Sequence, residues 1–204
     1  MATEVVRIDP VAPDAQVVRG AARVLARGGL VAFPTETFYG LGAAALDRAA
    51  VQRVFALKGR PASSPLLVLV DGLEMAERVA EIPSHARALI ARHWPGALTL
   101  VFHARAIVPD EVTAGGRTVG VRWSSHPVAC GLAAALGMPV TAPSANATGA
   151  MPPTSADDVV RDLGHALDLV LDGGETTGGL PSTVLDVTVD PPRVIRAGAV
   201  RLAS

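Results

Sequence analysis

A lysine and an arginine separated by one glycine form the part of this sequence best suited to chemistry on an anion. Lys58 is the only lysine among the 18 basic residues, and Arg60 follows two positions later. An ammonium is a compact point charge and a guanidinium is a planar fork, so the pair could clamp a polyphosphate. The alternative is that both cations lie in solvent at a helix C-terminus, where they complement the helix dipole. The spacing alone leaves both interpretations open.

Hydroxyl, amide and guanidinium groups recur at the expected ends of other strands. Residues 143–149 read P-S-A-N-A-T-G and contain Ser144 and Asn146, while P-S-T and R-A-G contain Ser182 and Arg196. Each segment either contacts phosphate and ribose oxygens or is a plain turn, because Ser, Asn and Gly are turn formers. Several such segments at strand ends, without an acidic pair among them, predict a site for a negatively charged substrate.

Residues 33–42, F-P-T-E-T-F-Y-G-L-G, form a polar segment after a short apolar strand. Pro34 cannot donate a ladder hydrogen bond and is expected to end that strand. Thr35 opens the polar part, and Gly40 and Gly42 close it, where glycine allows a ligand to approach or φ to be positive. This order is typical of a site at the carboxyl edge of an α/β sheet. The alternative is a polar turn between two strands.

Apolar periodicity, capping residues and Gly/Pro breaks predict the elements that position these groups. Helices are expected over residues 15–27, 47–58, 73–79, 84–93, 127–136 and 155–163. Strands are expected over residues 5–8, 30–33, 66–70, 98–102, 118–122, 138–141, 167–171, 183–187 and 193–196, with a Gly-rich turn at 113–117. No composition shift marks a linker. The sequence therefore predicts one α/β domain over residues 1–204, with a twisted open mixed sheet flanked by helices.

The composition excludes several classes of protein. Half of the residues are hydrophobic and 18% are charged, which is typical of a globular protein. The net charge of −1 and the 3% aromatic content argue against a protein that binds mainly to a nucleic-acid backbone. The absence of a signal peptide and of about 18 uninterrupted apolar residues predicts a cytoplasmic protein without a membrane span. Cys130, the single cysteine, is expected to be a small buried side chain.

Common catalytic motifs are absent from the sequence. It contains no P-loop and no G-x-S-x-G elbow. The glycines at 40 and 42 nominally fit a dinucleotide fingerprint, but no acidic residue occurs at 59–64, where a ribose-binding acid is expected. The five histidines show no metal-ligand spacing, so a zinc site is not expected.

Taken in order, the motifs of this sequence resemble the YrdC-type threonylcarbamoyl-AMP synthases. They are P-T-E-T-F-Y-G-L-G, K-G-R-P…P-L, W-P-G-A-L-T, V-x-V-R, P-S-A-N-x-T-G, P-S-T-V-L-D and V-I-R-A-G, spread over residues 17–200. The resemblance implies a YrdC-like open sheet whose concave, basic cleft holds the substrates, in the short form with one domain. The family's K-x-R…S-x-N pattern falls on Lys58, Arg60, Ser144 and Asn146. Ala97 replaces a proline that usually follows W-P-G, which should only loosen the turn. Ser64 and Leu69 stand where many members carry other side chains, so contacts through those two side chains are not carried over.

The resemblance implies an enzyme, a nucleotidyltransferase that joins L-threonine, bicarbonate (or CO₂) and ATP into threonylcarbamoyl-AMP and pyrophosphate. This is the first step of N6-threonylcarbamoyladenosine formation in tRNA, and other proteins then transfer the group. Lys58 and Arg60 would be the catalytic cations and would bind ATP together with Ser144, Asn146 and Arg196. By resemblance, the threonine-binding residues would be Thr35, Arg122 and Ser182.

The resemblance further implies Mg²⁺ carried by ATP rather than by protein side chains, and it leaves weak binding of tRNA open. Two alternatives also remain open at this stage. One is a non-catalytic RNA-binding module. The other is a domain that forms carbamoyl-adenylate from carbamoyl phosphate.

Overall fold

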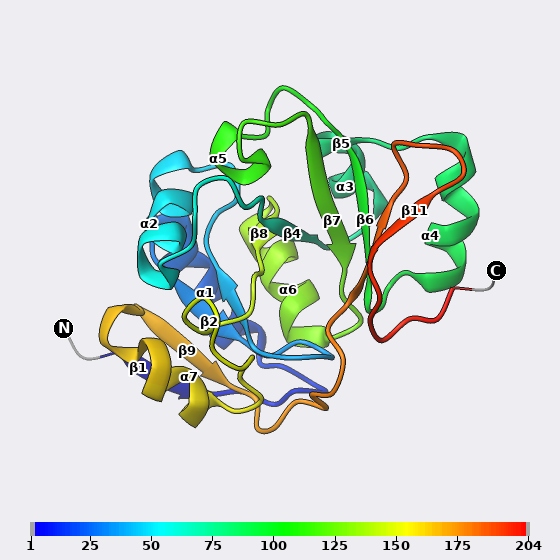
Figure 1. Cartoon of the computed structure of the whole chain (residues 1–204). Helices are drawn as coiled ribbons and strands as arrows, with labels where there is room; N and C mark the ends of the chain where they lie inside the picture. The colour runs from blue at the N-terminus through cyan, green and yellow to red at the C-terminus, as the bar shows by residue number, and fades with distance from the viewer. Residues whose placement is uncertain (1–2, 203–204) are drawn as a thin grey trace.

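The computed structural model describes residues 3–202, whose strands form two open sheets (Figure 1). The 4-stranded sheet has the order β1 (Glu4–Arg7), β9 (Leu169–Asp172), β2 (Val31–Phe33) and β3 (Gly40–Gly42). The 7-stranded sheet has the order β11 (Arg193–Arg196), β10 (Thr183–Asp186), β6 (Leu98–Ala104), β7 (Thr118–Trp123), β4 (Leu67–Val70) and β8 (Val140–Thr141), and β5 (Ala80–Glu81) pairs with β6. Both sheets contain parallel and antiparallel pairs. The predicted mixed α/β class with open sheets is confirmed.

The sequence predicts one sheet, whereas the strands divide into two that meet where β3 approaches β8. An isolated bridge pairs Gly40 with Ser144. The buried hydroxyl of Thr141 donates to the carbonyl of Leu41 at 3.0 Å and accepts from the amide of Ala43 at 2.9 Å. Apolar alternation marks a strand but does not say which strand it pairs with. The division into two sheets was therefore not accessible from the sequence pattern.

Strand β3 lies within the segment that the sequence analysis treats as a loop. It pairs antiparallel with β2, and Leu41 is fully buried. A Cβ atom at Gly42 would lie 2.8 Å from the ring of Phe33 and 2.9 Å from Val140. Neither Gly40 nor Gly42 takes a positive φ. These glycines therefore make room for neighbouring side chains, rather than supplying an unusual backbone conformation.

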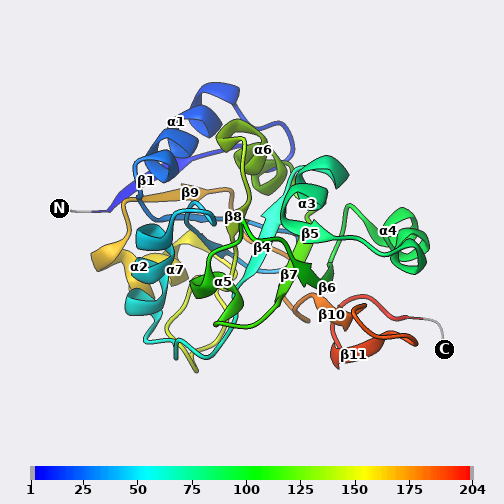
Figure 2. The same ribbon diagram turned by 90° about the horizontal axis from the view of Figure 1, so that it is seen from above.

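The helices cover the sheets and begin largely where local chemistry predicts. They are α1 (Ala15–Ala26), α2 (Arg48–Lys58), α3 (Leu73–Val79), α4 (Arg87–His93), α5 (Asp110–Thr113), α6 (Pro127–Leu136) and α7 (Ala156–Leu163), with 3₁₀ turns at Ser84–Ala86 and Gly164–Ala166. Asp14, Asp47 and Ser155 accept backbone N–H groups as N-caps. Helix α1 packs beside α6 and against β2 and β9, while α6 packs against β4, so this pair spans both sheets (Figure 2).

Some details differ from the sequence-based expectations. Helix α5 and strand β5 are too short to carry a periodic pattern and were not predicted. Cys130 is half-buried rather than fully buried, and its Sγ lies 3.8 Å from the carbonyl oxygen of Asp71. Over residues 3–202, none of the helices has the length and apolar character needed to span a bilayer.

Candidate functional site

A cavity of about 440 Å³ is lined by residues from both sheets and from the loops that leave them. Six of the eight predicted site residues line it, namely Thr35, Arg60, Arg122, Ser144, Ser182 and Arg196. They come from the loop after β2, the turn after α2, strand β7, the loop after β8, and the segments around β10 and β11. The tertiary structure therefore brings most of the predicted polar groups to one place.

Lys58 and Asn146 lie directly behind this wall instead of lining it. Lys58 ends α2 and is only 4% exposed, so the alternative of a solvent-exposed cation is wrong. Its Nζ donates to the carbonyl oxygens of Ser144 and Asn146, each at 2.5 Å. The Asn146 amide in turn donates to the carbonyl of Ala150 at 2.7 Å. The lone ammonium thus holds the 143–149 loop in shape from inside.

The turn that follows Lys58 is fixed by local backbone conformation and by Arg60. Gly59 has φ 59° and ψ 34°, the left-handed conformation that terminates α2 as predicted. Burial, and then the charge of Arg60, lower the pKa of Lys58 to about 8. The Arg60 side chain turns back and donates to the carbonyls of Ser64 and Pro65, at 3.3 and 2.9 Å. Because Ser64 takes part through its carbonyl, its unusual side chain does not affect this contact.

The threonine at the start of the 34–39 loop shapes that loop. The hydroxyl of Thr35 donates to the carbonyl of Phe38 at 2.7 Å and accepts from the amide of Thr37 at 3.2 Å. Tyr39, which follows Phe38, is fully buried, and its hydroxyl donates to the carbonyl of Gly174 at 2.6 Å. Burial raises the pKa of Tyr39 to about 12. These contacts hold the loop against the 173–174 turn and keep the Thr35 side chain at the cavity wall.

Arg122 enters the cavity from β7 as half of an ion pair. Its Nη2 lies 2.8 Å from Oε1 of Glu36, and its Nε donates to the carbonyl of Gly96 at 3.2 Å. Burial tends to raise the pKa of Glu36, but the Arg122 charge and the hydroxyl of Ser124 outweigh it and leave the pKa below its usual value. The Glu36 carboxylate is therefore ionised at neutral pH.

A chain of hydroxyls anchors Arg196, a second arginine at the cavity, which is exposed at the end of β11. Nη2 of Arg196 donates to Oγ of Ser182 at 3.1 Å, and that oxygen lies 2.9 Å from Oγ1 of Thr99. The Arg196 guanidinium also donates to the carbonyl of Ser182 through Nε and Nη2, at 3.1 and 2.8 Å. Burial, and then the charge of Arg122, lower the pKa of Arg196, so these two cations are close enough to repel each other.

Sequence reasoning missed Glu36, Thr37, Tyr39 and Thr99, which line the cavity or hold its lining. Three of them lie in the 33–42 segment that was singled out, and the fourth lies in W-P-G-A-L-T. Their positions were visible in the motifs, but their roles depend on partners far away in the chain.

The cavity has the chemistry of an anion-binding site. No Asp, Glu, His or Cys occurs among the described residues that line it, whereas three guanidiniums and several hydroxyls do. Over residues 3–202, no group of three or more His, Cys, Asp and Glu side chains could hold a metal ion. Fold and site define an α/β protein whose cavity presents guanidiniums and hydroxyls, groups that suit an anionic ligand.

Comparisons with known proteins place the chain within a family. The Sua5/YciO/YrdC family model, described as "Telomere recombination", matches residues 23–198. The chain therefore belongs to the Sua5/YciO/YrdC family, as its motifs predict. It is 47% identical over 186 residues to the threonylcarbamoyl-AMP synthase of Pyrococcus abyssi, covering 91% of this chain and 55% of that protein.

Two further comparisons agree. Over 190 residues the chain is 42% identical to the threonylcarbamoyl-AMP synthase of Bacillus subtilis, covering 92% of this chain and 54% of that protein. The structure of P. abyssi Sua5 complexed with L-threonine superposes with a TM-score of 0.93 at 44% identity, covering 96% of this chain and 58% of that one. The chain thus spans about half the length of these relatives.

Proposed function

We propose that this chain catalyses formation of threonylcarbamoyl-AMP from L-threonine, bicarbonate (or CO₂) and ATP, with release of pyrophosphate. The observation that carries the proposal is the cavity in which three guanidiniums and several hydroxyls converge from the ordered family motifs. The names of the relatives and the threonine complex of P. abyssi Sua5 support the choice of substrates.

The reaction needs two bond-forming steps. The threonine amine first attacks bicarbonate to give a carbamate, with loss of water. A carbamate oxygen then attacks the α-phosphorus of ATP, and the bond to pyrophosphate breaks. Neither step requires a covalent intermediate with the protein, and phosphoryl chemistry depends mostly on positioning and charge stabilisation. A cavity lined by arginines and hydroxyls suits that requirement.

The residues divide into two groups in this proposal. Arg60 and Arg196 stabilise the phosphate charges, with Ser144 on the same wall. Lys58 acts from behind, because its ammonium fixes the loop that carries Ser144 and Asn146 and adds positive charge nearby. Thr35, Ser182 and Arg122 form the threonine side, where a guanidinium suits the carboxylate and hydroxyls suit the side-chain oxygen.

We further propose that Mg²⁺ arrives with ATP. The described residues that line the cavity supply hydroxyls and guanidiniums but no carboxylate, so phosphate oxygens and water suit Mg²⁺ better than this wall does. When bound, the ion neutralises phosphate charge. The product is a mixed anhydride, and we propose that separate tRNA-threonylcarbamoyl transferase proteins consume it.

The decisive experiment measures pyrophosphate release with ATP, threonine and bicarbonate, each omitted in turn. The proposal requires that all three are needed. Turnover that persists without threonine but needs carbamoyl phosphate would favour carbamoyl-adenylate chemistry. Tight, salt-sensitive tRNA binding in a filter assay, without any ATP turnover, would favour an RNA-binding module.

A further inference from the structure

Glu36 joins the loop after β2 to the arginine on β7, and the proposed reaction gives it no role. Its Oε1 lies 2.8 Å from Nη2 of Arg122 and accepts from the amide of Ser125 at 3.2 Å. Its Oε2 accepts a hydrogen bond from the hydroxyl of Ser124. Both carboxylate oxygens therefore have partners, and Glu36 is not among the residues that line the cavity. It is poorly placed to take a proton from a substrate and well placed to act through Arg122.

The Arg122 guanidinium needs such a partner. Its side chain is only 6% exposed, and its charge lies near that of the exposed Arg196. A buried cation with a second cation nearby is unfavourable unless a carboxylate offsets its charge. Apart from the ion pair with Glu36, its side chain has one hydrogen bond, from Nε to the carbonyl of Gly96. Without the carboxylate, the guanidinium would be uncompensated and would keep only the contact of its Nε with Gly96.

The loop that carries Glu36 is itself anchored at a second point. The carbonyl oxygen of Glu36 accepts from the hydroxyl of Thr177 at 2.6 Å, and the amide of Gly178 donates to the carbonyl of Thr37 at 2.9 Å. The carboxylate is thus held between the 174–179 segment and the turn after β7. A rigid loop of this kind transmits its position to the cation that it contacts.

We propose that Glu36 is a positioning residue, which fixes the Arg122 guanidinium at the cavity wall and offsets its charge until an anionic substrate group binds there. The inference rests on the proposed function and deepens it, because it assigns to a carboxylate outside the cavity control over one side of the substrate site. It predicts that loss of Glu36 affects the substrate bound by Arg122 and spares the other.

The test compares Glu36→Ala and Glu36→Gln by pyrophosphate release, with KM measured separately for threonine and for ATP. In Glu36→Ala the KM for threonine should rise about 10- to 100-fold, because misplacing one positioning group by about 1 Å has effects of this size. The KM for ATP should change much less. Glu36→Gln keeps an oxygen that lies beside Arg122 and accepts from the amide of Ser125, so it should restore much of the loss.

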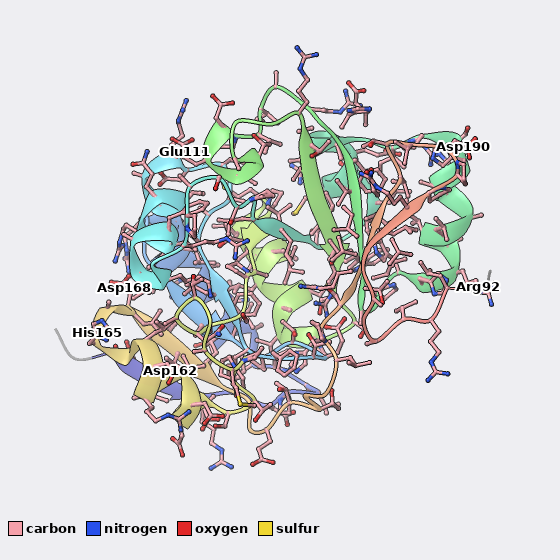
Figure 3. All side chains as sticks on the ribbon, viewed as in Figure 1. Arg92, Glu111, Asp162, His165, Asp168 and Asp190 are labelled. Atoms are coloured by element: carbon pink, nitrogen blue, oxygen red, sulfur yellow. The ribbon has the colours of Figure 1, made fainter. Side chains whose placement is uncertain are left out.

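Glu111 supplies a matched control. Its carboxylate lies 3.1 Å from Nε of Arg48 and its side chain is 17% exposed, close to the 19% of Glu36, but its partner Arg48 does not line the cavity. Figure 3 shows Glu111 on α5 at the edge of the molecule. Glu111→Ala should leave both KM values unchanged. If Glu36→Ala raises both KM values equally, or neither, Glu36 is only structural and the inference is wrong.

Failure of the proposed function would be recognised separately, as an absence of threonine-dependent pyrophosphate release in the wild type. A double-mutant cycle then tests the positioning role without activity. Glu36→Ala should lower the Tm of the wild type more than it lowers the Tm of Arg122→Met, because the partner is already missing there. Equal shifts in the two backgrounds would show that the side chains are uncoupled and would overturn the inference.

Discussion

Replacing Lys58 tests the two tasks that the structure gives to its ammonium, namely bracing a loop and supplying charge. Lys58→Met removes both while keeping most of the side-chain length, and Lys58→Ala also removes the bulk. Lys58 acts through the loop that carries Ser144 rather than by touching the phosphate, and a shift of that loop by about 1 Å can lower the rate about 10²-fold. Pyrophosphate release by either variant should fall by that amount. Near-normal release would refute the assignment of Lys58 to the site.

Lys58→Met should change the free energy of unfolding only slightly, because two effects of burial oppose each other. The carbonyls of Ser144 and Asn146 both lose their donor, each at a cost of about 1–3 kcal/mol. Against this, burial lowers the pKa of Lys58 from 10.5 to about 8, which makes the protonated form about 3 kcal/mol less favourable in the folded state. At pH 7 the variant Lys58→Met is relieved of that penalty. Its free energy of unfolding should therefore lie within about 3 kcal/mol of the wild type.

The pH dependence gives this reasoning its sharpest check. Between pH 8 and 10.5 the unfolded chain keeps the Lys58 proton and the folded chain loses it, so wild-type stability rises with pH relative to Lys58→Met. From pH 8 to about pH 9.5, the free energy of unfolding of the wild type minus that of Lys58→Met, measured with urea, should rise by about 2 kcal/mol.

Loop bracing should persist over this range, because a neutral amine still has two N–H groups for two carbonyls. The charge is lost, however, so kcat/KM for ATP should fall above pH about 8. If the difference in free energy of unfolding between the wild type and Lys58→Met does not change with pH, the pKa of Lys58 is not lowered.

Three further changes test other parts of the structure. Tyr39→Phe removes the hydrogen bond to the Gly174 carbonyl and should lower the free energy of unfolding by about 1–2 kcal/mol. Because burial raises the pKa of Tyr39 to about 12, the wild type should lose stability relative to this variant as pH rises from 10 toward 12, which urea titrations would measure. Gly42→Ala places a methyl group 2.8 Å from the Phe33 ring and should cost about 1–3 kcal/mol, seen as a lower Tm. Arg196→Lys keeps the charge but loses the fork, so the KM for ATP should rise about tenfold in the pyrophosphate assay.

Much of the secondary structure was predictable because its causes are local. Asp14, Asp47 and Ser155 cap helices through hydrogen bonds to amides two or three residues away, and Gly59 ends α2 in its own left-handed conformation. Strand β3 was missed because its glycines leave room for the ring of Phe33, which packs against them from the paired strand β2. The signal for that strand lies in a neighbour and not in the segment itself.

The candidate site likewise has features that the sequence predicts and features that depend on tertiary contacts. The sequence by itself determined which residue types carry the chemistry, because the lone lysine, the arginines and the Ser/Asn turn stand out by type and order. Only the tertiary structure decided that Lys58 lies behind the cavity wall and that Glu36 pairs with Arg122. The physical reason is that burial and charge compensation depend on which strands and loops meet in space. Those tertiary contacts join residues that are far apart in the chain, and a local sequence pattern does not predict them.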